Sequence, residues 1–246
     1  KAHVPNVLAT RYASPEMAKI WSSEEKIVLE RELWVAVLEG QRDLGLDIED
    51  STVEAYRSVI GEVDLESIER RERITLHDVK ARIEEFCSLA GHEDIHKGLT
   101  SRDLTENVEQ LQIKRAMILI QQRLVAVISR LAELAIEHQS TAVTGRSHNV
   151  PAQTTTLGKR FANLGQETIL AFERLEELLQ RYPLRGLKGP VGTQQDLLDL
   201  FEGDSSKVNE LERLVADRLG FERTLNAVGQ IYPRSLDLDV ISGLTQ

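Results

Sequence analysis

The sequence predicts an all-α protein in which a domain of shorter helices precedes a bundle of long helices. Residues 101–144 contain no glycine or proline, and no alternating β-branched run bounded by tight turns occurs in the chain. Apolar residues recur every seven positions in that stretch, as in a helix packed along its length in a bundle. These positions are Leu104, Leu111, Ile118, Val125 and Ala132. A helix of about 35 residues spans roughly 50 Å, which only an elongated bundle accommodates.

We expect two parts: an N-terminal helical domain over 1–100 and a central long-helix bundle domain over 101–246. A second long helix is expected from about 155 to 181. Tyr232-Pro233 opens a further helix, and the sequence reaches Gln246 within that helical pattern. We therefore expect the bundle to be incomplete and more polypeptide to belong to this fold.

Local signals mark the ends of the shorter helices, because capping residues satisfy the free backbone groups there. In chain order they are Ser14-Pro15-Glu16 at a helix start, a helix over about 23–44 that stops at Gly45, a capping box at Ser51 and Glu54, and Thr75 as the cap of a helix that ends at Gly91. The remaining segments 91–100, 145–153 and 184–193 are expected to be loops.

Composition excludes several classes of function. The chain has 246 residues, 41% of them hydrophobic and 28% charged, with a net charge of -10. An acidic protein is a poor ligand for nucleic acid or an anionic membrane, although a pocket in it can still be locally basic. The single cysteine, Cys87, cannot form an internal disulfide. No apolar stretch approaches the roughly 20 residues of a membrane span, and the first residues of the sequence lack the long apolar region of a signal peptide. We expect a soluble cytoplasmic protein.

The candidate chemical residues are histidines and a helix start. His77 lies early in a predicted helix, His92 and His96 flank a predicted loop, and His148 lies in the loop between two long helices. Thr100-Ser101 begins the longest helix, where free N–H groups favour an anion. Simpler interpretations compete with each of these. A lone histidine is usually a surface or structural residue, and Thr100 is equally an ordinary cap.

Two other patterns point weakly to ligands. His92 and His96 have the spacing of metal ligands on a helix, but Gly91 and Gly98 bracket them and no matching ligand cluster accompanies them. The glycine-rich segment 186–192 lacks the Lys-Ser/Thr ending of a phosphate-binding loop. Pattern alone therefore indicates only a helical bundle without a metal site.

Several segments together resemble the adenylosuccinate lyases, a branch of the fumarase/aspartase superfamily. In chain order they are RYASPEM at 11–17, HDVKA at 77–81, HKGLTSRDLTENV at 96–108, GRSHNVPAQTTTLGKR at 145–160, LRGLKGPVGT at 184–193 and GQIYPRSLD at 229–237. The TS-x-D and GR-[ST]-H patterns are general to the superfamily. RYASPEM, KGPVGT and GQIYPRSLD are typical of the adenylosuccinate branch.

The resemblance implies a C–N lyase. It implies a β-elimination of fumarate from adenylosuccinate, giving AMP, and from the succinylated aminoimidazole carboxamide ribotide, giving AICAR. A base removes a proton from the succinyl group, the charge spreads into the adjacent carboxylate, and an acid protonates the departing nitrogen. Such chemistry needs a matched acid and base and donors around the carboxylate.

The resemblance also assigns roles to residues. The implied catalytic residues are His148, as general acid, and His77, which supports acid catalysis or holds the phosphate. The implied substrate-binding residues are Arg11 and Tyr12 near the phosphate, Asp78, Thr100 and Ser101 on the succinyl carboxylates, and Gln230 as an orienting amide. His96 and Lys97 are implied neighbours of the site.

The sequence departs from the family pattern in three places. Leu76 stands where relatives commonly have a basic residue, which puts one phosphate contact in doubt. Ser147 replaces the commoner threonine and keeps the hydroxyl. The Ser-Ser-x-Met-Pro-x-Lys type loop that carries the serine base does not occur, and we expect it beyond Gln246. We therefore expect no meaningful turnover from these 246 residues alone.

The resemblance further implies a homotetramer with active sites shared between subunits, a small-molecule nucleotide substrate, and no cofactor or metal. Two alternatives stay open. One is a sister lyase such as argininosuccinate lyase, fumarase, aspartase or a carboxymuconate cycloisomerase. The other is a non-catalytic helical scaffold on the same fold, although such a scaffold does not need Thr100, Ser101 or His148.

Overall fold

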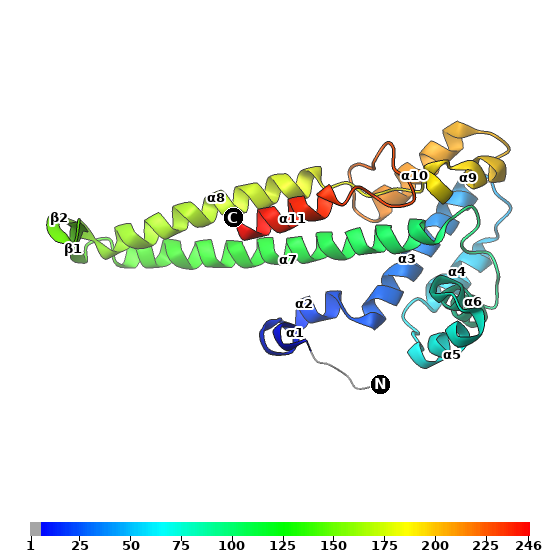
Figure 1. Cartoon of the computed structure of the whole chain (residues 1–246), viewed down its shortest axis with the longest axis horizontal. Coiled ribbons are helices and arrows are strands. Elements are labelled where there is room, and N and C mark those ends of the chain that lie inside the picture. Colours follow the sequence, from blue (N-terminus) through cyan, green and yellow to red (C-terminus); the bar gives the residue numbers. More distant parts are fainter. Residues whose placement is uncertain (1–5) are drawn as a thin grey trace. The chain divides into compact units, whose positions relative to one another are not determined.

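A computed structural model describes residues 6–246 of the chain and confirms the all-α class (Figure 1). The chain forms two compact units, one of Lys1–Arg115 with Tyr182–Arg234 and one of Ala116–Arg181 with Ser235–Gln246. In chain order the elements are α1 (Val7–Tyr12), α2 (Pro15–Ile20), α3 (Ser23–Asp43), α4 (Asp50–Ser58), α5 (Leu65–Thr75), α6 (Asp78–Ala90), α7 (Ser101–Glu137), β1 (Ala142–Ser147), β2 (Val150–Thr156), α8 (Leu157–Arg181), the 3-10 helix η1 (Pro190–Gly192), α9 (Gln195–Leu200), α10 (Ser205–Arg218) and α11 (Ser235–Thr245).

Several predicted helix ends are confirmed. The Ser14 hydroxyl accepts a hydrogen bond from the Met17 N–H at the start of α2, with Pro15 in the first turn. Helix α3 covers the predicted range, and Gly91 ends α6 in the left-handed conformation that favours glycine. Helices α1, α5, α9 and α10 were not among the predicted elements.

Two predicted caps are wrong. Ser51 lies inside α4, whose cap position is Glu49, and its hydroxyl donates to the Glu49 carboxylate instead of accepting from the backbone. Thr75 is the last residue of α5, and His77 caps α6. In both places another residue at the cap position has the extended backbone conformation that capping requires.

The segment expected to be the loop 145–153 belongs to a β-hairpin. Strands β1 and β2 pair antiparallel, with a register irregularity between Gly145 and Arg146. His148 and Asn149 form the turn, both with positive φ, a conformation that two-residue hairpin turns require. The strands are largely exposed and threonine-rich, so the alternation of apolar and polar residues that marks a strand is missing.

The core of the first unit is centred on α3, which buries Leu29, Leu33, Trp34 and Leu38 almost completely. Helix α10 packs against α3, and α6 packs against α4 and α5. Segment 182–234 therefore completes the unit that begins with the N-terminal helices, because α10 covers a face of α3.

Helix α7 contributes to both units, and its heptad positions differ in burial. Leu104 and Leu111 are buried in the first unit, whereas Ile118 and Val125 are 37% and 53% exposed. Within the second unit, the later part of α7, α8 and α11 lie along one another (Figure 1). The boundaries of these two units differ from the domain boundary that we expected near residue 100. The division into two domains at that residue stays a prediction. Within 6–246, no helix is long and apolar enough to cross a membrane.

Candidate active site

His77 connects the start of α6 to the start of α7. Its Nδ1 accepts a hydrogen bond from the Lys80 N–H at 3.3 Å, as a helix cap does. Its Nε2 then lies 3.5 Å from the Ser101 hydroxyl oxygen. The structure thus brings together two predicted site residues that are distant in the sequence, and both side chains remain accessible to a ligand.

Asp78 is part of a charged chain that leads into the core. Arg82 donates to Asp78 at 2.6 Å, and the Arg82 Nε lies 3.0 Å from Oε2 of Glu30 on α3. Burial acts to raise the pKa of Asp78, but Arg82, the Val79 N–H and His77 outweigh it, so the pKa is lowered. Burial raises the pKa of Glu30 to about 7 despite the attraction of Arg82.

Gln230 joins the start of α7 to the glycine-rich loop. Its amide donates to the Thr100 hydroxyl at 3.3 Å and accepts from the Val191 N–H at 2.7 Å. Gly192 allows this approach, because it has a φ of +82° and a Cβ there would lie 1.9 Å from the Val228 carbonyl oxygen. Thr100, Ser101 and Gln230 are therefore collected at one place.

A buried carboxylate, Asp103, holds these segments together. It accepts hydrogen bonds from the N–H groups of Thr100 at 2.9 Å, Lys188 at 2.9 Å and Gly189 at 3.1 Å. It also pairs with Arg185, and both side chains are completely buried. One carboxylate thereby ties the first turn of α7 to the loop that follows Tyr182.

Arg185 extends this connection to the segment that contains Gln230. It donates to the carbonyl oxygens of Gly229 and Gln230 at 3.4 and 3.2 Å. Glu106 on α7 completes the anchor by accepting from the Tyr232 N–H and from Arg234, each at 2.7 Å. The sequence analysis did not single out Asp103 or Arg185, although both lie in the motifs TSRD and LRGLKGPVGT that carry the resemblance.

His96 and Lys97 occupy the turn before α7. His96 Nδ1 accepts from the Trp34 indole N–H at 3.0 Å, and burial lowers the pKa of His96 to about 4, which Asp103 opposes and His77 reinforces. Lys97 directs its ammonium to Asp94 at 2.6 Å. The His96 carbonyl oxygen accepts a hydrogen bond from the Leu99 N–H at 3.3 Å, so His96 lies in the turn that leads directly to Thr100.

Arg11, Tyr12 and His148 belong to other elements than the candidates at the start of α7. Arg11 and Tyr12 lie on α1, and the Tyr12 side chain is 76% exposed. His148 is exposed at the tip of the β1–β2 hairpin in the second unit, where Arg146 donates to the Asn149 carbonyl at 3.0 Å. The roles of all these residues remain predictions.

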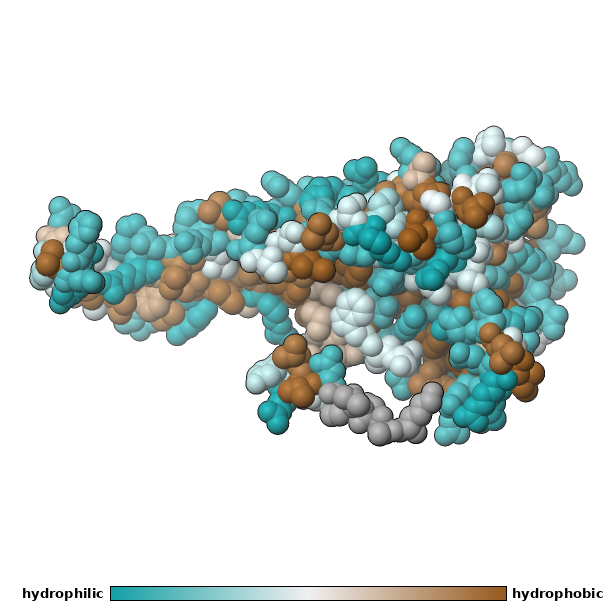
Figure 2. Space-filling view, in the orientation of Figure 1, coloured by the Kyte–Doolittle hydropathy of each residue, from teal (hydrophilic) through white to brown (hydrophobic). Residues whose placement is uncertain are grey.

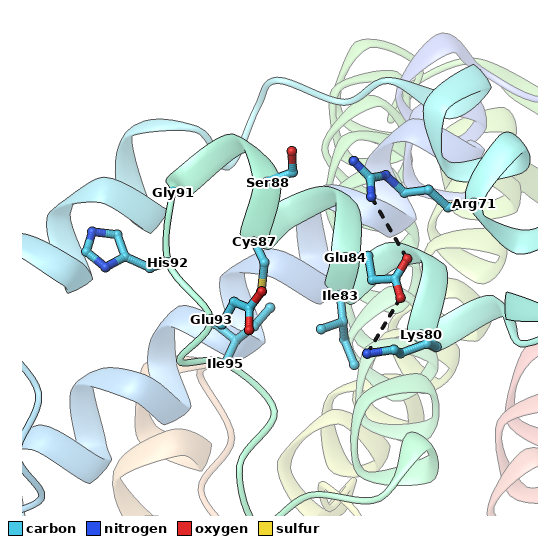
Figure 3. A pocket seen from close by; sticks show the side chains of 10 residues that line it. All are labelled: Arg71, Lys80, Ile83, Glu84, Cys87, Ser88, Gly91, His92, Glu93 and Ile95. Atoms are coloured by element: carbon cyan, nitrogen blue, oxygen red, sulfur yellow. Dashed lines mark ion pairs between the residues drawn. The ribbon is translucent and has the colours of Figure 1, made fainter. Parts of the chain in front are cut away.

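A separate cavity of about 720 Å³ lies beside the C-terminal half of α6, and none of the predicted site residues lines it (Figure 3). Glu84 pairs there with Arg71 and Lys80 at 3.9 and 3.6 Å. In the described part of the chain, no three His, Cys, Asp or Glu residues are placed to hold a metal ion.

The collected groups suit a substrate with carboxylates. The hydroxyls of Thr100 and Ser101, the amide of Gln230 and the imidazole of His77 are hydrogen-bonding groups, and the start of α7 contributes the positive end of a helix dipole. Donors arranged in advance around a developing anion stabilise it in a transition state. The described residues of this cluster provide donors but no obvious strong base.

Comparison with known proteins agrees with this picture. The chain matches the lyase family over residues 10–218 and therefore belongs to it. A solved structure of a fumarate lyase from Mesorhizobium sp. BNC1 has the same fold, with a TM-score of 0.78 over 94% of this chain and 53% of that chain, at 23% identity.

Within this family, the chain is similar to adenylosuccinate lyases, as the sequence motifs predicted. It is 35% identical to the adenylosuccinate lyase of Schistosoma mansoni over 98% of this chain and 51% of that protein. It is 36% identical to the adenylosuccinate lyase of Saccharomyces cerevisiae over 97% of this chain and 50% of that protein. The chain thus spans about half the length of the curated relatives it matches.

Proposed function

We propose that this chain is part of an adenylosuccinate lyase, a cytoplasmic C–N lyase that eliminates fumarate from adenylosuccinate and from the succinylated aminoimidazole carboxamide ribotide. The similarity to adenylosuccinate lyases along almost the whole chain carries the proposal. The cluster of Thr100, Ser101, His77 and Gln230 supports it, because these groups suit the recognition of the succinyl carboxylates.

In the proposed reaction, a base removes a proton from the succinyl carbon next to the carbon that bears nitrogen. The electron pair forms the double bond of fumarate as the C–N bond breaks, and the electrons of that bond go to the nitrogen. His148 protonates the departing nitrogen, and Thr100 and Ser101 hydrogen-bond to the carboxylate that carries the transient charge. Arg11 and Tyr12 hold the phosphate, and Asp78 is a further substrate-binding residue beside His77.

We further propose that copies of the chain share each site. Ser101 is the first residue of α7, and His148 follows its other end. A helix of 37 residues rises about 55 Å at 1.5 Å per residue, so a second copy is the natural source of His148 for the site at Ser101.

The surface of the second unit supports a homotetramer built along the long helices. Exposed apolar patches of unusual size mark interaction surfaces. Figure 2 shows hydrophobic side chains along this unit. On α7, α8 and α11 the exposed large apolar residues are Ile118, Val125, Val127, Ile136, Leu164, Ile169, Leu170, Leu238, Ile241 and Leu244.

The direct test is fumarate release from adenylosuccinate by the full-length protein. We expect release in the wild type and its collapse in His148→Ala, with the variant still folded by circular dichroism. His138→Ala is the matched control, since His138 lies in the same unit outside the proposed site. A folded, inactive wild type would contradict the proposal, and release of fumarate from argininosuccinate would then identify a sister lyase.

A further inference from the structure

Trp34 lies beneath the turn that precedes α7. The side chain is 1% exposed, on α3, and its indole N–H points at Nδ1 of His96 with a separation of 3.0 Å. The two rings meet edge to face, with an interplanar angle of 80°. The contact therefore combines ring packing with a directional hydrogen bond inside the core.

This hydrogen bond determines which nitrogen of His96 carries the proton. An indole N–H only donates, so Nδ1 must be the acceptor and cannot hold a proton. The single proton of the neutral ring is then on Nε2. Because burial lowers the pKa of His96 to about 4, the ring stays neutral at physiological pH, although the charge of Asp103 favours the charged form.

The backbone of the same turn is held by α3 as well. Gln41, one heptad after Trp34, donates from its amide to the Lys97 carbonyl oxygen at 3.0 Å. His96 has a φ of +67°, in the left-handed region that non-glycine residues rarely adopt. Such conformations persist only where the surrounding structure imposes them. Trp34 and Gln41 supply that constraint from one helix face.

We propose that Trp34 is a positioning residue for the elimination: it holds His96 as the Nε2–H tautomer, so that the ring offers a neutral N–H donor to the site at the start of α7. The inference rests on the proposed function. A neutral donor stabilises a developing carboxylate-centred charge without transferring a proton, whereas the other tautomer would present a lone pair to an anionic substrate.

The first test is Trp34→Phe in the full-length protein, with Trp21→Phe as the matched control. Phenylalanine keeps an aromatic ring in the core but removes the N–H, and Trp21 is half exposed at the end of α2. Magic-angle-spinning NMR of 15N-histidine-labelled protein, assigned through loss of the His96 signals in His96→Gln, reports the tautomer. We expect an unprotonated Nδ1 in the wild type and in Trp21→Phe, and a protonated Nδ1 to appear in Trp34→Phe.

Kinetics provides the second test. Loss of one buried hydrogen bond predicts a fall of about tenfold in kcat/KM for adenylosuccinate in Trp34→Phe, and little change in Trp21→Phe. His96→Gln, whose amide N–H replaces the Nε2 donor, should retain more activity than His96→Asn, whose amide lies nearer Nδ1. This pair tests the donor position even if Trp34→Phe fails to fold.

A double-mutant cycle separates positioning from stability. If Trp34 acts through His96, Trp34→Phe causes no further loss of kcat/KM in the His96→Gln background, whereas a structural role causes the same loss in both backgrounds. An unchanged tautomer in Trp34→Phe, or additive losses, would overturn the proposal. Absence of turnover on adenylosuccinate in the wild type contradicts only the proposed function, because the tautomer measurement needs no substrate.

Discussion

Replacing Asp103 by asparagine tests whether one buried carboxylate holds the candidate site together. In the folded chain this carboxylate accepts three backbone hydrogen bonds, from Thr100, Lys188 and Gly189, and pairs with Arg185. Asparagine keeps the shape but loses the charge and one acceptor oxygen. The change removes the buried ion pair between Arg185 and Asp103, leaving Glu106 at 3.6 Å as the nearby carboxylate of the buried guanidinium, and it leaves at least one N–H group facing an amide NH₂.

Breaking a buried ion pair from one side costs about 3–5 kcal/mol, because the remaining charge stays in the core with less compensation. That is a large fraction of the roughly 5–15 kcal/mol that stabilises a typical domain. At about 2–4 °C per kcal/mol for a unit of this size, the melting temperature should fall by about 6–20 °C. Asp47→Asn, at an exposed position, should leave stability almost unchanged.

Urea unfolding of Asp103→Asn, Arg185→Met and the double variant measures the coupling between the two side chains. We expect the double variant to be less destabilised than the sum of the single variants, since removing Arg185 also removes the buried charge that Asp103 no longer compensates. A loss below about 1 kcal/mol in Asp103→Asn, or additive losses, would refute this account of the network.

Three further predictions follow from single side chains. Because the pKa of Glu30 rises from 4.5 to about 7 on folding, the folded state binds this proton more tightly than the unfolded state. The free energy of unfolding of the wild type should therefore fall by about 3 kcal/mol as the pH rises across that range. Urea unfolding of Glu30→Gln at pH 5 and 8 should lack this pH dependence, and an equal dependence in the variant would contradict burial of Glu30 as the cause. Gly192→Ala should lower the melting temperature more than Gly203→Ala. Both glycines have positive φ, but only a Cβ at Gly192 would lie 1.9 Å from a carbonyl oxygen. Equal losses in the two variants would mean that the loop around Gly192 adjusts to the added methyl group. If the exposed apolar surface of the second unit is a subunit interface, Val125→Glu should reduce the mass measured by light scattering. Ile74→Glu, at an exposed position of the first unit, should leave the mass unchanged. An unchanged mass in Val125→Glu would exclude Val125 from the interface.

Local sequence signals predicted much of the helical framework. Ser14 and Gly91 end helices where expected, since capping depends on neighbouring backbone groups alone. The same reasoning failed at Ser51 and Thr75, because Glu49 and His77 take the cap positions of α4 and α6 instead. It also missed the hairpin turn at His148, because that turn uses positive φ without a glycine to signal it.

The sequence by itself determined the helical class, the long α7 and the family motifs, because periodicity, capping and motif order are properties of neighbouring residues. Only the tertiary structure showed that Asp103 and Arg185 connect α7, the glycine-rich loop and Gln230, and that the Trp34 indole N–H donates to His96. Those contacts join residues far apart in the chain, and their energies depend on complete burial. The motifs alone give neither the distances between these side chains nor their burial. The hydrogen bonds and ion pairs of the candidate site therefore depend on how the chain packs in three dimensions.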